Sequence, residues 1–231
     1  MNVKYAEFIG LMFGDGCLSK TGRARYIYIA GHKINDLEYH TSITKNLFKE
    51  LFNKDVKIEF RKDEETLFIR FSDKALFEEL SEYLPIGSKY RHLTIPPIIL
   101  QDKECFFAFV RGLADTDGCV VFSKQHRSYR YYPRIEITSK SKAFLVEILS
   151  ELKTHGFYGS VSHKGKENYR LEIPGNKNLN NWLSLIGFNN PTKMEKIRKY
   201  KSASGPIRIR QLGPEDQTSG DLMVNSHLLH R

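Results

Sequence analysis

The stretch that decides the fold lies at residues 110–118 and reads VRGLADTDG, an apolar helix-like run that ends in an acidic turn. A related stretch, FIGLMFGDG, lies at residues 8–16. One Asp-Gly after a helix is most often only a turn. Two of them, each behind a Gly-Leu helix, indicate a duplicated unit that carries a site. Identical residues at one offset of 102 relate the two stretches: Gly10 and Gly112, Leu11 and Leu113, Asp15 and Asp117, Gly16 and Gly118.

The order of helix-like and strand-like segments repeats with the motif. Apolar periodicity predicts a motif helix, two strands, an amphipathic helix, two strands and a last helix in each half. The sequence therefore predicts an α+β fold of two pseudo-symmetric αββαββα repeats. Each repeat is a saddle-shaped antiparallel sheet backed by helices, and the motif helices pack at the centre. The predicted segments are 3–14, 17–21, 25–31, 35–52, 57–61, 67–71 and 72–84, then 103–115, 119–124, 130–138, 141–154, 158–164, 168–173 and 177–186.

Composition marks the boundaries between the parts of the chain. We expect an N-terminal half at 1–84 and an extended linker at 85–101, whose prolines disfavour helix. A C-terminal half follows at 102–200 and ends in a short helix with Asn190 as its cap and Pro191 at its first position. Ser, Gly, Pro and Gln accumulate after it, so we expect a poorly ordered tail at 201–231.

Charge favours a polyanionic partner. The net charge is +9 and the pI about 9.3, which suits binding to phosphates, although many basic proteins are merely soluble. Residues 1–100 hold 15 basic and 14 acidic side chains, whereas residues 101–200 hold 17 and 10. We therefore expect the C-terminal half to hold a nucleic acid more tightly.

Cysteine spacing and hydropathy bound the protein class. Three cysteines without a Cys-x-x-Cys spacing argue against a disulfide scaffold or a zinc site and fit a reducing compartment. Cys17 and Cys119 take matching places after the two Asp-Gly turns, where we expect small strand residues. No apolar run is long enough for a membrane span. We expect a cytoplasmic, nucleoid-associated or organellar protein with no membrane partner.

Asp15 and Asp117 are expected to emerge side by side if the motif helices pack against each other. Their carboxylates would then repel each other and meet the negative ends of two helix dipoles. A divalent cation removes this cost, and hard oxygen ligands with some waters favour Mg²⁺, which bridges carboxylates to phosphates. We predict a metal site at Asp15 and Asp117, with the adjoining Gly14 and Thr116 included.

The strands offer basic and aromatic side chains at alternating positions, a pattern that a DNA major groove could accept. A solvated sheet face is the competing interpretation. The residues that we expect to contact DNA are Lys20, Arg25, Tyr28, Lys57, Arg61 and Arg70 in the first half, and Lys124, Gln125, Arg130, Tyr132, Arg134, Lys164 and Arg170 in the second.

The two stretches GLMFGDG, at 10–16, and GLADTDG, at 112–118, resemble the paired LAGLIDADG motifs of homing endonucleases. The resemblance extends over residues 1–200 and is closest to single-chain, two-motif archaeal intron-encoded members. It implies that Asp15 and Asp117 bind catalytic Mg²⁺ ions, at two or three sites shared with DNA phosphates, where Mn²⁺ or Ca²⁺ can substitute in binding. It also implies a monomer that cleaves both strands of double-stranded DNA across the minor groove and leaves 3′ overhangs.

The family also places a lysine after the second strand of each half, at positions that correspond to Lys33 and Lys140. His32 and Ser139 precede them, where the family often has a residue that positions water. Such a lysine can stabilise charge on a phosphorane or perturb a nucleophilic water. The competing interpretation is a lysine that only contacts a phosphate or is solvated. Motif one departs from the pattern at Phe13, a position that is not a metal ligand in the family.

Two other functions use the same fold. A non-cleaving DNA-binding regulator or an RNA-splicing maturase would be favoured by loss of a motif carboxylate or lysine, and both pairs are present here. A dual role with an RNA intron stays open. A nuclease carried in an intein is disfavoured by a chain that starts at Met1 and ends Leu-His-Arg, without splicing residues.

Overall fold

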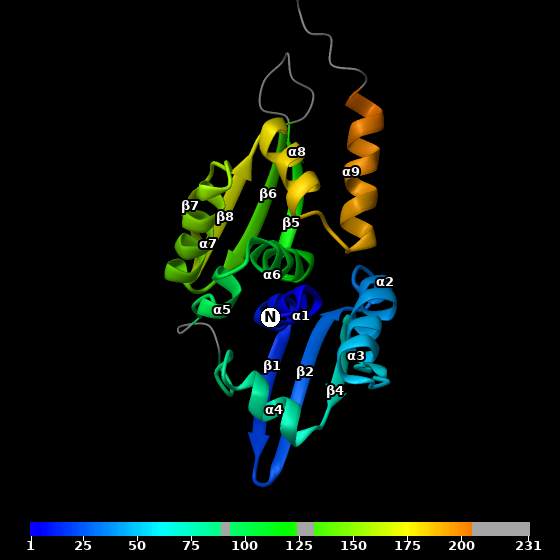
Figure 1. Ribbon diagram of the computed structural model, residues 1–231. Helices are drawn as coiled ribbons and strands as arrows, with labels where there is room; N and C mark the ends of the chain where they lie inside the picture. Colours follow the sequence, from blue (N-terminus) through cyan, green and yellow to red (C-terminus); the bar gives the residue numbers. More distant parts are fainter. Residues whose placement is uncertain (89–92, 124–131, 205–231) are drawn as a thin grey trace, which may run out of the picture.

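The computed structural model describes residues 1–88, 93–123 and 132–204, and it consists of two halves with the same order of elements (Figure 1). The first half holds α1 (Val3–Gly14), β1 (Gly16–Thr21), β2 (Ala24–His32), α2 (Leu37–Tyr39), the π-helical turn η1 (His40–Thr44), α3 (Lys45–Phe52), β3 (Ile58–Phe60), β4 (Thr66–Phe71) and α4 (Lys74–Leu80). A short helix, α5 (Pro97–Leu100), follows.

The second half repeats this order and adds a helix. It holds α6 (Lys103–Thr116), β5 (Gly118–Ser123), β6 (Tyr132–Ser139), α7 (Lys142–Thr154), β7 (Ser160–Gly165), β8 (Asn168–Pro174), α8 (Asn176–Leu185) and α9 (Pro191–Ser204).

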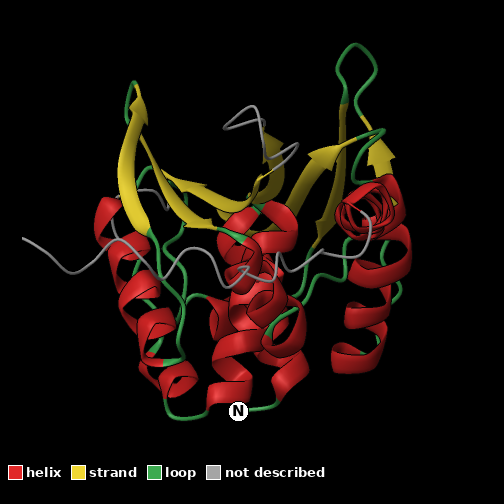
Figure 2. Ribbon diagram, turned by 90° about the horizontal axis from the view of Figure 1, so that it is seen from above, coloured by secondary structure: helices red, strands yellow, loops and turns green. Residues whose placement is uncertain are grey.

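Each half builds one antiparallel sheet, with strand orders β1-β2-β4-β3 and β5-β6-β8-β7. The register is also repeated, since Gly16 pairs with Ile29 in one sheet and Gly118 with Ile137 in the other. Figure 2 shows the helices gathered on one side of both sheets, while the opposite sheet faces stay open and form a saddle. The predicted α+β fold of two pseudo-symmetric repeats is confirmed.

Helices α1 and α6 pack against each other between the two halves (Figure 1). A β-carbon on Gly10 would collide with the Phe109 carbonyl oxygen, and one on Gly112 with the Glu7 carbonyl oxygen. The two backbones therefore touch because glycine has no side chain at these positions. The predicted packing of the motif helices at the centre is confirmed.

Two local predictions about the ends of the halves were wrong. The linker at 85–101 is not free of helix, because α5 forms there with Pro97 at its first position, where a missing N–H costs nothing. Its Ile99 is fully buried. The last helix is long rather than short, and it continues through residues 201–204, where we expected the tail to begin. Asn190 does cap it, by accepting the Thr192 N–H at 3.1 Å.

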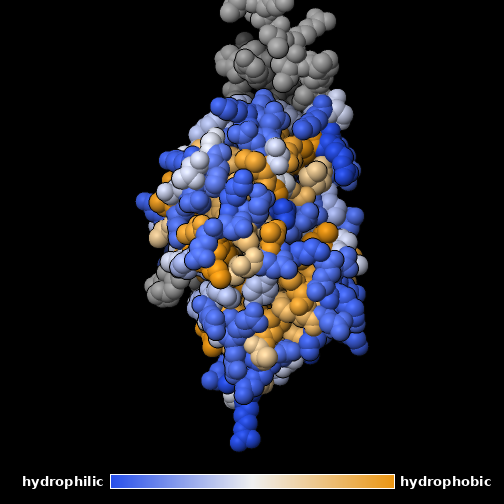
Figure 3. All heavy atoms as spheres, viewed as in Figure 1, coloured by the Kyte–Doolittle hydropathy of each residue, from blue (hydrophilic) through white to orange (hydrophobic). Residues whose placement is uncertain are grey.

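The length of α9 follows from its packing. The Tyr200 ring stacks on Phe122 of β5 at a centroid distance of 4.1 Å, and Ile197 is buried. Within the part of the chain that the structure describes, no helix is both long and apolar enough to span a membrane. The face drawn in Figure 3 is mostly hydrophilic, with apolar side chains between the polar ones.

Candidate active site and nucleic-acid face

Asp15 and Asp117 occupy matching positions at the ends of α1 and α6. The Asp15 backbone N–H donates to the Leu11 carbonyl at 3.0 Å, and that of Asp117 to Leu113 at 2.9 Å. The backbone of each aspartate is therefore held by the last turn of its own helix, and the two helices contact each other through their backbones. A cavity of about 460 Å³ holds both residues; its lining is Gly14, Asp15, Gly16, Cys17, Ala30, Gly87, Ser88 and Asp117.

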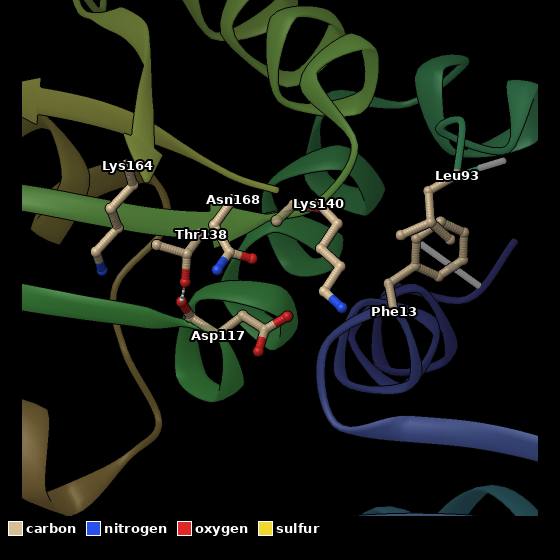
Figure 4. A pocket seen from close by; sticks show the side chains of 8 residues that line it. Phe13, Leu93, Asp117, Thr138, Lys140, Lys164 and Asn168 are labelled. Atoms are coloured by element: carbon tan, nitrogen blue, oxygen red, sulfur yellow. Dashed lines mark hydrogen bonds between the residues drawn. The ribbon is translucent and has the colours of Figure 1, made fainter. Parts of the chain in front are cut away.

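A second cavity, of about 320 Å³, lies on the other side of Asp117 and is rich in polar groups. In Figure 4 the Lys140 side chain points toward the Asp117 carboxylate, with Thr138, Lys164 and Asn168 around it. The Thr138 hydroxyl donates to the Asp117 carbonyl at 3.4 Å. Ser139, as predicted, lies in the same lining. The structure thus brings Ser139 and Lys140 to Asp117.

Thr138 and Asn168 were missed in the sequence, although a signal for both was present. Thr138 alternates with Ile137, which is buried on the helix side of the sheet, and so points to the open face. Asn168 stands two residues before Arg170 on β8 and shares its face for the same reason. Strict alternation along the two strands would have placed both residues on the open face of the sheet.

His32 and Lys33 are not brought to Asp15. The Lys33 ammonium donates to the Glu64 carbonyl at 3.4 Å, in the β3–β4 turn. The His32 ring lies 3.1 Å from the Glu65 carboxylate through Nε2, and its Nδ1 accepts two backbone N–H groups of the following turn. Neither residue lines the cavity that contains Asp15.

The sheet register also corrects the correspondence between the halves. The N–H groups of Ala30 and Thr138 donate to the carbonyls of Asp15 and Asp117, which makes these two residues equivalent. His32, not Lys33, therefore occupies the position of Lys140. The pairing of Lys33 with Lys140 was therefore wrong by one residue. The connections that follow the strands also differ in length, since four residues separate β2 from α2 and only two separate β6 from α7.

A lysine from α9 lies under the end of α6. The Lys193 ammonium donates to the carbonyls of Ala114 and Asp115, both at 2.6 Å. These carbonyls belong to the last turn of the helix, where the dipole is negative and a cation is stabilising. Burial lowers the pKa of Lys193, whereas the Asp115 carboxylate acts in the opposite direction. Nothing in the sequence around Lys193 indicated this contact.

Asp115 also holds the start of α9 against the C-terminal end of α6. Its carboxylate accepts the backbone N–H groups of Asn189, at 2.9 Å, and Asn190, at 3.1 Å. Burial raises the pKa of Asp115 to about 7, against the lowering effect of Lys193 and of the two N–H donors. At this motif position the second half uses Asp115 to bind the start of α9, whereas the first half has Phe13.

A buried ion pair joins α1 to α6. Arg111 donates to the Glu7 carboxylate at 2.6 Å, and the Asn189 side-chain amide donates to the other Glu7 oxygen at 2.6 Å. Glu7 is only 4% exposed. Because each partner comes from a different element, this network sets how the two halves and α9 meet beneath Asp15 and Asp117.

The predicted DNA-contacting residues divide between the two faces of the first sheet. Tyr28 and Arg70 form a cross-strand pair on the open face. Arg25 stands two residues before the buried Ile27 and so shares its face, and its guanidinium lies 5.7 Å from the centre of the Phe77 ring on the helix side. Lys20, its cross-strand partner, shares that side. The placement of Arg25 and Lys20 on the open face was therefore wrong.

Other predicted contacts lie where a duplex could reach them. Lys57 precedes β3, and Arg61 follows it and pairs with Glu64 at 3.2 Å. Tyr132, Arg134 and Arg170 lie on the open face of the second sheet, and Lys164 lines the cavity beside Asp117. Lys124, Gln125 and Arg130 lie outside the described residues.

The two cysteines take the matching strand positions that the repeat predicts. Cys17 and Cys119 are the second residues of β1 and β5, and Cys17 lines the cavity with Asp15. Among the described residues, no group of three or more His, Cys, Asp or Glu side chains gathers into a metal cage. A cation here would use the carboxylate pair and find its other ligands elsewhere.

Comparison with known proteins relates the second half of the chain to a known domain. Residues 104–187 match the model of the LAGLIDADG-like domain. The chain is 30% identical over 219 residues to a probable translation initiation factor IF-2 of Methanocaldococcus jannaschii. The alignment covers 87% of this chain but 17% of that protein. The chain thus spans about a sixth of that relative, so the relative's named activity is not carried over.

Solved structures share the whole fold. A crystal structure of I-DmoI in complex with DNA and Mn superposes with a TM-score of 0.57 at 22% identity, over 80% of this chain and 98% of that one. The homing endonuclease I-WcaI bound to its DNA recognition sequence gives 0.58 at 15% identity, over 84% and 85%. The resemblance to the LAGLIDADG family is confirmed, and at these identities the structures establish the fold.

Proposed function

We propose that this chain, a two-repeat LAGLIDADG protein by its domain match and its fold, is a site-specific endonuclease for double-stranded DNA. It hydrolyses one phosphodiester in each strand across the minor groove and leaves 3′ overhangs. The observation that carries the proposal is the carboxylate pair, because Asp15 and Asp117 share one cavity at the ends of two helices whose backbones touch. A purely structural turn has no need of two like charges there.

The donor set fits Mg²⁺. Asp15 and Asp117 provide hard oxygen ligands, Gly14 and Thr116 adjoin them, and the remaining positions suit water and DNA phosphates. When bound, such cations polarise the phosphodiester and lower the pKa of a coordinated water. We propose two or three ions shared with the DNA, with Mn²⁺ or Ca²⁺ as substitutes in binding.

The residues around Asp117 supply the rest of the chemistry. Lys140 points toward the carboxylate in Figure 4, and from there its ammonium can stabilise charge that builds on the scissile phosphate. Ser139 and Asn168 can orient water, and Lys164 can hold a neighbouring phosphate. His32 and Lys33 act at the Asp15 side only after leaving Glu65 and Glu64, so we assign the stronger catalytic contribution to Lys140.

The open faces of the two sheets form the DNA-binding surface. A monomer with an internal pseudo-two-fold axis can place one sheet on each half of a target, which suits an asymmetric duplex site. The second half carries the larger excess of basic residues. We propose that it contributes more of the phosphate contacts and of the salt-dependent affinity.

A cleavage selection on a randomised duplex library tests the activity and finds the target together. With Mg²⁺ the wild type is expected to cut a defined site, and Asp15→Asn or Asp117→Asn is expected to bind that site without cutting it. Asp63→Asn, an exposed carboxylate in the β3–β4 turn, is the control that should cut normally. Normal cutting by both active-site variants would disprove the assignment.

One observation favours a second candidate, a DNA-binding regulator that does not cleave. No lysine lines the cavity at Asp15 in the described residues, so one half-site lacks a cation that the other has. Footprinting with and without EDTA separates the two functions. A regulator would protect the same sequence in both conditions and leave no nick after long incubation with Mg²⁺.

A further inference from the structure

Four charged side chains form a closed ring on the second sheet, and we call them the charged quartet. Arg134 and Glu136 come from β6, and Arg170 and Glu172 from β8. Arg170 lies 3.3 Å from the Glu136 carboxylate and 3.2 Å from that of Glu172. Arg134 lies 3.6 Å from Glu136 and 3.8 Å from Glu172. Each arginine therefore contacts both glutamates.

The quartet lies on the open face of the sheet, next to the candidate active site. Ile135 and Ile137, which alternate with its β6 members, are buried on the helix side. Thr138 continues the quartet's side of β6 and lines the cavity at Asp117. Figure 2 shows that this side of the sheet is free of helices. A duplex seated for cleavage would therefore pass over the quartet.

The charges of the quartet make it a poor phosphate site. Two arginines and two glutamates cancel, and a phosphate that approached the arginines would also meet two carboxylates. Glu136 is only 5% exposed, so its carboxylate stays with the arginines at an appreciable desolvation cost. Phosphate binding on this face is better served by Lys164, at the edge of the cavity. The quartet is suited to a ligand that both donates and accepts hydrogen bonds.

A base-pair edge is such a ligand. Guanine presents two acceptors in the major groove, which match the paired N–H donors of arginine, while cytosine presents an amino group that a carboxylate accepts. The Nε atoms of Arg134 and Arg170 are buried and have no hydrogen-bond partner among the described residues, and the terminal guanidinium nitrogens are the donors that the glutamates hold. Because the glutamates already hold both guanidiniums, less side-chain freedom is lost when a base binds.

The first sheet has different chemistry at the same four places. The pair of Tyr28 with Arg70 corresponds in register to Glu136 with Glu172. Tyr26 and Phe68 complete the equivalent square, so aromatic rings replace three of the four charges. The quartet therefore belongs to one half only and is not required by the duplicated sheet.

We propose that the charged quartet reads a G·C base pair in the major groove of the DNA segment held by the second sheet. The arginines donate to guanine and a glutamate accepts from cytosine. This inference rests on the proposed function only in that the bound partner is a DNA duplex.

Binding selection from a randomised duplex library in EDTA tests the inference without cleavage. The wild type is expected to enrich a G·C pair at one position of the segment that the second half contacts. Arg170→Lys keeps the charge but loses the paired donors, so the preference there should fall about tenfold while the salt dependence of binding stays the same. Arg70→Lys, at the equivalent square of the first sheet, is the matched control and should leave that position unchanged.

Glu136→Gln provides an independent second test, because it removes a carboxylate and keeps the shape. The freed arginines should then reach phosphates, so that binding to non-specific duplex tightens and its log–log salt slope steepens by about one. Preference for G·C should fall at the same position as in Arg170→Lys. Unchanged G·C preference in Arg170→Lys, or no G·C enrichment by the wild type, overturns the inference while duplex binding stands. Failure of the wild type to bind any duplex would instead overturn the proposed function.

Discussion

The C-terminal ends of α1 and α6 have the same backbone arrangement, but different side chains surround them. Around Asp117 the chain gathers Ser139, Lys140, Lys164 and Asn168, whereas the cavity at Asp15 is lined by glycines, a cysteine and small side chains. The backbones of the two aspartates are nevertheless held alike, since their N–H to carbonyl distances agree to within 0.1 Å. Duplication preserved the element that orients the carboxylates and left the surrounding residues free to diverge.

The same contrast appears inside the motifs. Phe13 and Asp115 occupy equivalent positions. The Phe13 ring packs against the rings of Phe109 and Phe144 at centroid distances of 5.1 and 5.6 Å, whereas Asp115 binds the start of α9. One half uses the position for its core and the other uses it to dock a helix. The halves are therefore equivalent in packing and unequal in chemistry, and the following experiments test both statements.

The largest effect is expected where the halves are equivalent. Gly10→Leu and Gly112→Leu each drive a side chain into the backbone of the other motif helix, and each should cost about 3 kcal/mol or more of stability. Cleavage should be lost together with folding. Urea unfolding measures this, with Val146→Leu on the exposed side of α7 as the control. A clear difference between the two glycine variants would contradict the equivalence of the helices.

The next effect tests the chemical difference. Lys140→Met should slow cleavage of one strand about 100-fold, because it removes a cation beside Asp117. Lys33→Met should change either strand less than about threefold, since its ammonium lies at the β3–β4 turn. Time courses on supercoiled plasmid, with strand-specific labels on the linear target, show which strand is affected; Lys142→Met is the control.

Equal losses from Lys140→Met and Lys33→Met would show that DNA binding rearranges the first half. Slowing of both strands together by Lys140→Met would show instead that the two carboxylates act on one scissile bond at a time. Either outcome would contradict the predicted strand-specific effect of Lys140.

A buried histidine makes the first half more sensitive to acid. Burial lowers the pKa of His40 to about 4, below its ordinary 6.5. The unfolded chain then binds more protons between these values, so stability is full above pH 6.5 and falls as the pH drops toward 4. Between pH 7.5 and 5 the contribution of His40 should fall by about 2 kcal/mol. Asp115, whose pKa is raised to about 7, changes stability in the opposite direction over this range, so the effect of His40 is measured as the difference between the wild type and His40→Gln. Hydrogen exchange at both pH values should locate the loss of stability from His40 in α2 to α3. His40→Gln should abolish most of that loss.

The smallest effect concerns the brace under Asp117. Lys193→Met removes the cation from the last turn of α6 and should cost about 1 kcal/mol of stability. Cleavage of the strand served by Asp117 should slow a few-fold, with binding retained. Lys196→Met, exposed on the same helix, is the matched control. Equal slowing of both strands would argue that Lys193 supports the whole helix pair instead of one carboxylate.

Local patterns were sufficient for the duplicated plan and insufficient for the surroundings of the site. Asn2 and Asp102 cap the motif helices, and each accepts an N–H from the first turn. Lys33 was matched with Lys140, but the strand register makes His32 the equivalent residue. Arg25 was misplaced because its strand parity, set by the buried Ile27, was not applied. Both errors concern where a side chain points, which depends on register.

What the sequence determined by itself is the pair of motif helices, their glycines, the two terminal carboxylates and the αββαββα order. Those features depend on periodicity, capping and turn chemistry within a few residues of chain. Tertiary structure alone decided which groups surround each carboxylate. Lys193 meets Ala114 across 79 residues and Arg170 meets Glu136 across 34, because strand register and helix docking bring them together. Contacts of that kind arise from packing whole elements against one another, and no short pattern in the chain encodes them.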